Sequence, residues 1–176
     1  MGTPGRPTGR ASSASLVARA AGERARSAEL EVLRWVVSDP GRVLAWLDGV
    51  LFVDPLLRAV FDLAVEEPDL PSAAELVASR GADPTDTAAL NMLFRLAVEP
   101  PTHEPEDAVS RIVGNATSRA IADLAAASAA GIDNIDVSAI SNLKLLHGRL
   151  SDADQGIRVE ALGLLVPWLV AWGHRQ

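Results

Sequence analysis

The residues of this chain that could do chemistry do not form a catalytic or metal-binding motif. The three histidines, His103, His147 and His174, are far apart and have no companion side chains at the spacing of metal ligands. Cysteine is absent, which excludes disulfides and thiolate metal sites. The glycine-rich motifs that cradle phosphates in P-loop and Rossmann proteins do not occur. The sequence therefore predicts no catalytic residue, no metal site and no cofactor.

Two short groups of carboxylates could in principle hold a cation. Asp152 and Asp154 form a D-x-D pair, but the paired carboxylates of polymerases lie at strand ends, and no sheet is expected here. Helix capping is the simpler interpretation of Asp152. Residues 133–136, Asp-Asn-Ile-Asp, lack the central glycine and closing glutamate of a calcium loop. We therefore expect that this chain is not an enzyme.

An uncharged stretch near the C-terminus is the strongest functional feature. Residues 161–172 read ALGLLVPWLVAW, without the polar residues that a helix with one buried face would show. Twelve residues are too few to cross a bilayer, which needs about twenty, so no membrane association is expected. Pro167 is expected to kink the helix. Two interpretations stay open: the helix is buried within the domain, or one face contacts a partner through Trp168 and Trp172.

A second apolar seam lies just before this stretch. The segment 138–150 has leucines on one side and charged residues elsewhere, as at the rim of an interface, although an ordinary solvated face is the alternative for each polar residue. Two helices joined by a short loop form a hairpin. The candidate partner-binding residues are Leu143, Leu146, Arg149, Leu162, Leu165, Trp168, Leu169 and Trp172.

Composition indicates which elements position this hairpin. Hydrophobic residues make up 48% of the 176 residues, but aromatic residues only 4%, and tyrosine is absent. Strands favour β-branched and aromatic residues, so the abundance of Ala, Leu and Val favours helices. The predicted fold class is all-α: a compact bundle of about six helices followed by a C-terminal helical hairpin.

Asp-Pro dipeptides predict several helix starts. Asp39, Asp54 and Asp83 each precede a proline; the aspartate caps the first turn, and proline there loses no needed donor. Ser72, with Glu75, forms a capping box. The expected helices span residues 27–37, 40–47, 55–66, 72–81, 85–99, 105–130, 138–150 and 154–173. An extension of the first helix back to residue 15 is left open, the fourth stops at Gly81, and the fifth begins at residue 85 or 87.

The phrase Phe-x-Leu-Ala-Val-Glu-x-Pro occurs twice, beginning at Phe61 and at Phe94. A helical-repeat array needs at least three copies to bury its faces, and no third copy is present. We interpret the phrase as two helices that end alike, and we do not expect a solenoid.

Charge separates the beginning of the chain from the rest. Residues 1–26 hold five arginines and one glutamate, whereas the whole chain has a net charge of −7. The acidic remainder repels phosphate, so direct nucleic-acid binding is not expected. Without an apolar core the leader is no secretory signal, and its Gly, Pro and Ser favour a flexible basic linker over a mitochondrial-type presequence. The expected domains are the linker 1–26, the helical bundle 27–130 and the hairpin 131–176.

The sequence pattern of the middle segments resembles that of a known family. The segments LEVLRWVVSDPGRVLAWLDG (30–49), LFVDPLLRAVFDLAVEEPDL (51–70) and TDTAALNMLFRLAVEPP (85–101) resemble the C-terminal helicase-binding region of bacterial DNA primases of the DnaG type. Ser118 to Leu124 is similar to the family's R-x-I-A-E-L run. The continuation AAASAAG lacks the lysines and arginines that follow in many members. Their electrostatic contacts are therefore not expected here.

This resemblance, which covers residues 28–172, implies a function. The chain would be a non-catalytic helicase-interaction module that recruits primase to the replicative helicase for primer synthesis. Its partners would be the N-terminal domains of the helicase, and the catalytic core of primase through the linker. It would be a cytoplasmic monomer or weak dimer at the replication fork. The alternatives are the N-terminal-type helical domain of a replicative helicase, disfavoured because the chain ends at Gln176 before any ATPase, and an unrelated self-associating helical regulatory protein.

Overall fold

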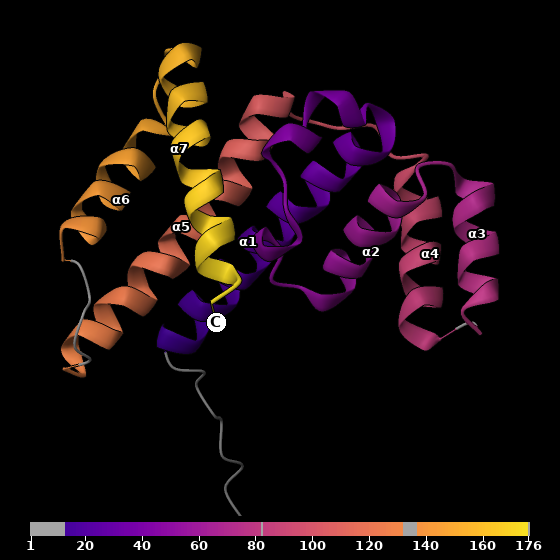
Figure 1. The fold of residues 1–176 in the computed structure, drawn as a ribbon, viewed down its shortest axis with the longest axis horizontal. Coiled ribbons are helices and arrows are strands. Elements are labelled where there is room, and N and C mark those ends of the chain that lie inside the picture. The colour runs from indigo at the N-terminus through magenta and orange to yellow at the C-terminus, as the bar shows by residue number, and fades with distance from the viewer. Residues whose placement is uncertain (1–12, 82, 132–136, 176) are drawn as a thin grey trace, which may run out of the picture.

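Helices form all of the regular structure in the part of the chain that the computed structural model describes, residues 13–81, 83–131 and 137–175 (Figure 1). Seven of them are α-helices and three are short 3-10 helices, which confirms the all-α fold class. The elements are α1 (Ser13–Ser38), η1 (Pro40–Arg42), η2 (Leu44–Trp46), η3 (Gly49–Leu51), α2 (Pro55–Glu66), α3 (Leu70–Ser79), α4 (Pro84–Leu96), α5 (Pro105–Ala129), α6 (Val137–Arg149) and α7 (Gln155–Gly173).

Helix α5 lies at the centre of the arrangement (Figure 1). Helix α1 packs along it and also contacts α2 and α4, and α3 closes that side by packing on α4. The hairpin of α6 and α7 packs on the other side of α5. A single hydrophobic core takes residues from all seven α-helices, from Val32 in α1 to Leu165 in α7. The hairpin predicted as 131–176 is therefore part of the same core as the bundle.

Two of the three Asp-Pro dipeptides start α-helices as predicted. The carboxylate of Asp54 accepts a hydrogen bond from the backbone N–H of Leu56 at 2.9 Å, and that of Asp83 accepts from Thr85 at 2.8 Å. Asp39 makes no capping hydrogen bond with its side chain and precedes only the 3-10 turn η1. The local signal at all three sites is the same, so tertiary packing decides which kind of helix each one starts.

The helix expected over 40–47 is wrong. The chain instead passes through η1, η2 and η3, and this irregular path brings both Val43 and Leu51 to 0% exposure. The bundle consequently contains five α-helices before the hairpin, not six.

Other helix ends differ from the prediction by a few residues. Helix α3 begins at Leu70, because Asp69 caps it by accepting from the backbone N–H of Ser72 at 2.9 Å. Gly81, with a φ of 84°, follows the end of α3 as expected for a left-handed stop. Helix α7 is unbroken through Pro167.

The predicted linker is partly wrong. Helix α1 begins at Ser13, so residues 13–26 are helical, while residues 1–12 lie outside the described part of the chain. Arg26 forms an ion pair with the capping carboxylate of Asp54, which ties this end of α1 to the start of α2. The open extension of the first helix toward residue 15 is therefore confirmed.

The two copies of the repeated phrase occupy different environments. Phe61 in α2 is 6% exposed and stacks on Phe52 with ring centroids 4.9 Å apart. Phe94 in α4 is 45% exposed. The helices α2 and α4 pack against each other, but they do not end alike as predicted: α2 continues through Glu66, the sixth residue of the phrase, whereas α4 ends at Leu96, the third.

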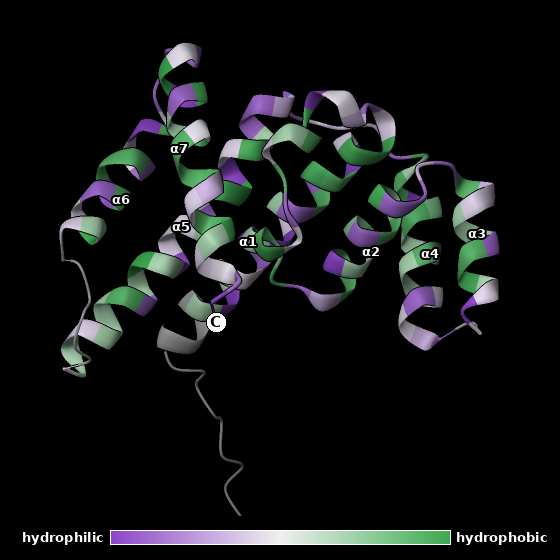
Figure 2. Cartoon of the chain, in the orientation of Figure 1, coloured by the Kyte–Doolittle hydropathy of each residue, from purple (hydrophilic) through white to green (hydrophobic). Residues whose placement is uncertain are grey.

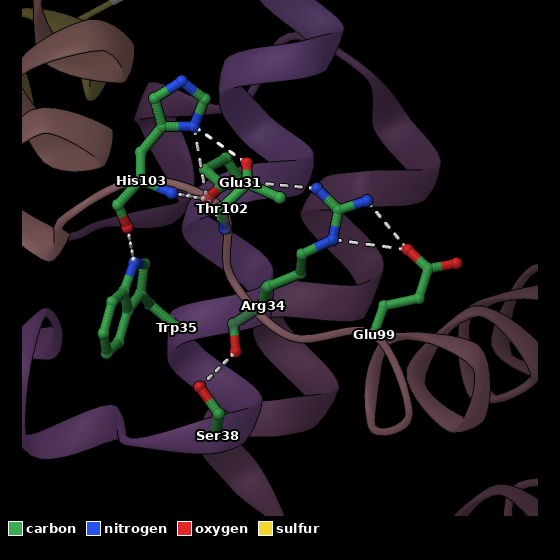
Figure 3. A network of polar contacts seen from close by, with 7 residues as sticks. All are labelled: Glu31, Arg34, Trp35, Ser38, Glu99, Thr102 and His103. Carbon is green, nitrogen blue, oxygen red and sulfur yellow. Dashed lines mark hydrogen bonds and ion pairs between the residues drawn. The ribbon is translucent and has the colours of Figure 1, made fainter.

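A buried carboxylate attaches the loop between α4 and α5 to α1 (Figure 3). Glu31 is 3% exposed and accepts hydrogen bonds from the backbone N–H groups of Thr102 and His103 and from Arg34. Arg34 also donates to Glu99 at 2.8 Å. Burial opposes the charged form of Glu31, but these hydrogen bonds outweigh it and lower its pKa.

A second buried carboxylate, Glu29, attaches α1 to the start of α2. It is 2% exposed and accepts from the backbone N–H groups of Val53 at 2.8 Å and Asp54 at 3.3 Å. Burial raises the pKa of Glu29 in spite of these bonds. Arg119 of α5 lies close by and donates to the carbonyl of Leu51 at 3.0 Å, and burial lowers its pKa.

Candidate functional site

The C-terminal hairpin is the candidate interaction site, and its turn is fixed by local hydrogen bonds. Asp154 caps α7 by accepting from the backbone N–H of Gly156 at 2.7 Å. Asp152 accepts from the backbone N–H of Asp154 at 2.9 Å. The cap of α7 is therefore Asp154, and Asp152, which we expected to cap the helix, instead stabilises the turn before it. The turn directs α7 back along α6 and onto α5.

Four of the eight predicted partner-binding residues lie in the core of the protein itself. Leu162 and Leu165 are 1% and 0% exposed, and Leu143 and Leu169 are 3% and 4% exposed. They belong to the hydrophobic cluster shared with α5. In this arrangement these leucines hold the hairpin to the bundle and present no surface to a partner.

The other four predicted residues, Leu146, Arg149, Trp168 and Trp172, are partly exposed. The two indole rings stack with centroids 5.5 Å apart and planes 9° from parallel. Arg175 lies over the ring of Trp172, 5.7 Å from its centroid. The i, i+4 spacing read from the sequence therefore does place the two rings on one face of α7.

The two tryptophans nevertheless border different surfaces. Trp172 lies beside Val50 and Arg119, where the end of α7 meets η3 and α5. Trp168 lines a groove of about 170 Å³ between α6 and α7. The groove is lined by Ala139, Asn142, Leu143, Leu146, Leu164 and Trp168.

Sequence reasoning missed the most exposed large apolar residues of the hairpin. Leu164 is 53% exposed and lines the groove four residues before Trp168, and Leu145 on α6 is 60% exposed. Leu164 belongs to the uncharged stretch 161–172, but a stretch that is apolar all round does not indicate which face is covered. Figure 2 shows hydrophobic segments along both α6 and α7.

Helix α7 is long and apolar, and five of its 19 residues are buried. By length and composition alone, it is the one helix in the described part of the chain that could cross a membrane. Only 28% of its apolar window is buried inside the protein. Because Ala161, Leu162 and Leu165 on α7 contribute to a shared core, length and composition do not decide where the protein is found.

His103 belongs to a group of polar side chains that anchors a loop. The ring Nδ1 of His103 lies 2.9 Å from the Thr102 hydroxyl and 3.5 Å from a carboxylate oxygen of Glu31 (Figure 3). Trp35 donates to the carbonyl of His103 at 2.9 Å. Glu31 is occupied by backbone donors, so the group has a structural role. Within the residues that the structure describes, no three His, Asp or Glu side chains are placed to hold a metal ion.

Comparison with known proteins adds no relative to this picture. The chain matches no protein-family model, and neither a curated protein nor a solved structure is significantly similar to it.

Proposed function

We propose that this chain is a non-catalytic protein-binding module that contacts its partner through the groove between α6 and α7. The observation that supports this is the exposed apolar surface of the hairpin, where Leu164 on α7 is 53% exposed and lines the groove beside the partly exposed Trp168. When a partner covers apolar surface that was exposed to water, the free energy falls, and this favours binding. Contiguous exposed apolar surface therefore marks interaction sites. Leu164 is exposed in this groove, and Trp168 beside it and Leu146 across from it are partly exposed.

The groove is suited to an apolar side of a partner helix. Leu164 and Trp168 are separated by one helical turn, and Leu146 faces them from the neighbouring helix. Helix-in-groove recognition uses anchors of this kind, with an aromatic residue contributing a large share of the binding free energy. The buried Leu143, on the floor of the same groove, keeps α6 at a fixed distance from α7.

The partner that we propose is the N-terminal region of a bacterial replicative helicase, because the sequence pattern of residues 30–101 resembles that of bacterial primases. In that function the module would recruit a primase catalytic core to the cytoplasmic replication fork. Tethering raises the local concentration of the core near the template without any chemistry in this domain.

Self-association through the same hairpin is the second candidate. Leu145 and Leu164 are both more than half exposed, and two copies could cover each other's apolar residues. Light scattering of the isolated chain distinguishes the two functions. A stable dimer without affinity for helicase would favour self-association over the proposed role.

The direct test of the proposal is fluorescence anisotropy of the full chain with a labelled helicase N-terminal domain. Replacing Trp168 with alanine should weaken binding by about 2 kcal/mol, or roughly thirtyfold, if Trp168 is an anchor. Leu164→Ala removes an exposed side chain without touching the core and should weaken binding about tenfold.

Phe94→Ala is the matched control. Phe94 is an exposed apolar residue of α4, at the end of the molecule away from the hairpin (Figure 1), and its loss should leave binding unchanged. Far-UV circular dichroism of each variant checks that the helices persist. Equal affinity of wild type, Leu164→Ala and Phe94→Ala would exclude the groove as the binding surface.

A further inference from the structure

Two buried polar atoms of the described residues have no hydrogen-bond partner, and they lie in the same region. They are the hydroxyl oxygen of Ser110 on α5 and the Nε of Arg158 on α7. Ser110 as a whole is 8% exposed. An unpaired buried donor is costly, and native structures contain few of them. Two such groups in one region are therefore suited to a ligand that accepts hydrogen bonds from both.

Both residues line one cavity, at a place distinct from the hairpin groove. The cavity has a volume of about 300 Å³ and lies where the first half of α5 meets the end of α6 and the start of α7. Asp107, Arg111, His147 and Ser151 also line it. It shares no lining residue with the groove that contains Leu164 and Trp168. Its size is at the lower end of the range for small-molecule sites.

The arginines of the cavity are arranged to receive negative charge. Arg158 donates through Nη1 to Asp107 at 2.6 Å, which orients the guanidinium and leaves Nε without a partner. Arg111 is exposed at the rim and makes no hydrogen bond or ion pair with any residue that the structure describes. Asp107 therefore neutralises only one of the two arginines.

The local charge is opposite to that of the protein. Arg111, Arg158 and Asp107 together carry a net charge of +1, in a chain whose total charge is −7. His147 also lines the cavity, and its Nε2 lies 3.1 Å from the Ser118 hydroxyl. A positive cavity on an acidic protein concentrates small anions.

We propose that this cavity binds a small phosphate-type oxyanion, either inorganic phosphate or the terminal phosphate of a phosphomonoester. The Ser110 hydroxyl and the Arg158 Nε–H are covered by other atoms in this structure, so both side chains would have to rotate to donate to the ligand. The exposed Arg111 guanidinium would donate from the edge of the cavity. Phosphate oxygens accept several hydrogen bonds at once, and arginine matches their geometry. The serine hydroxyl reaches a new acceptor by changing its rotamer.

The test is a thermal-shift and calorimetric titration of the full chain with sodium phosphate, methyl phosphate and sodium acetate, at ionic strength matched with sodium chloride. We expect saturable phosphate binding and a melting temperature about 4 °C higher at ten times the dissociation constant. Binding of methyl phosphate alone supports the site with a phosphomonoester as its ligand. Equal shifts with acetate, or no saturable shift with either phosphate, would overturn the proposal.

Two substitutions localise the binding. Arg111→Gln changes an exposed side chain, and Ser110→Ala removes one unpaired hydroxyl; each should weaken phosphate binding about tenfold. The matched control is Arg58→Gln, an exposed arginine on α2, which should bind as the wild type does. Equal affinities of the Arg111→Gln and Arg58→Gln variants would also overturn the proposal. Trp168→Ala should keep phosphate binding, so this site and the groove are tested separately.

Discussion

Replacing Glu31 with glutamine tests how the loop between α4 and α5 is held to α1. One carboxylate oxygen of Glu31 accepts from the backbone N–H groups of Thr102 and His103, the latter at 2.7 Å. The other accepts from Arg34 at 2.9 Å and from the Thr102 hydroxyl at 3.0 Å. Glutamine has one acceptor oxygen and an NH₂ group, so in either orientation the NH₂ group faces an N–H donor.

The expected loss follows from that geometry. At least one charge-assisted hydrogen bond disappears inside a site that is 3% exposed, and such a bond contributes about 1.5–3 kcal/mol. We expect the free energy of unfolding to fall by about 2–3 kcal/mol in urea denaturation followed by circular dichroism. Glu23→Gln is the control, because Glu23 pairs with Arg19 on the exposed surface of α1 and should change stability little.

The pH dependence of this difference gives a second readout. The pKa of Glu31 is lowered in the folded protein, so its contribution is present above the usual value of 4.5 and is lost as the pH falls through the folded pKa. The gap in unfolding free energy between wild type and Glu31→Gln should therefore shrink in acid. A loss no larger than that of Glu23→Gln at neutral pH, or a gap that does not depend on pH, would refute this explanation of how the loop is held.

Two further stability predictions use single substitutions. Ser110→Ala should raise the free energy of unfolding by about 1 kcal/mol in phosphate-free buffer, because it removes an unpaired buried hydroxyl; a destabilised variant would contradict this. Gly173→Ala should lower the free energy of unfolding by about 1–3 kcal/mol, because the new Cβ would lie 2.8 Å from the Cβ of Val50. Gly163→Ala in the same helix meets nothing within 4 Å and should raise the free energy of unfolding by about 0.5–1 kcal/mol. Equal melting temperatures of the two glycine variants would show that η3 and α7 are not packed as described.

Local signals in the sequence predicted most of the fold. Asp54 and Asp83 act within three residues of themselves, so their capping roles do not depend on the rest of the chain. Asp39 has the same signal, but its side chain makes no capping hydrogen bond and it leads only into the 3-10 turn η1. A capping motif indicates where a helix can begin, and packing decides whether it continues.

In the hairpin, the sequence did not predict which apolar residues are buried and which are exposed. Residues 161–172 contain no polar position that would distinguish an inner from an outer face. The burial of Leu165 and the exposure of Leu164 are decided by α5, which is distant in the sequence. For this reason half of the predicted partner-binding residues lie in the core.

The cavity on α5 could not be predicted from the sequence. Ser110 and Arg158 belong to different helices, and neither is part of a recognised motif. Only the packing of the hairpin on α5 brings them together. The same is true of Glu31 and His103, since isolated glutamates and histidines are common on helical proteins and carry no spacing signal across a loop.

The measurement that tests the central proposal most directly is hydrogen–deuterium exchange of the full chain with and without a replicative helicase N-terminal domain. Exchange should slow on binding in α6 and in the half of α7 that carries Leu164 and Trp168, and should stay unchanged in α3 and α4. Protection confined to α3 and α4, or no protection anywhere at saturating helicase, would contradict the proposal that the hairpin groove binds this partner.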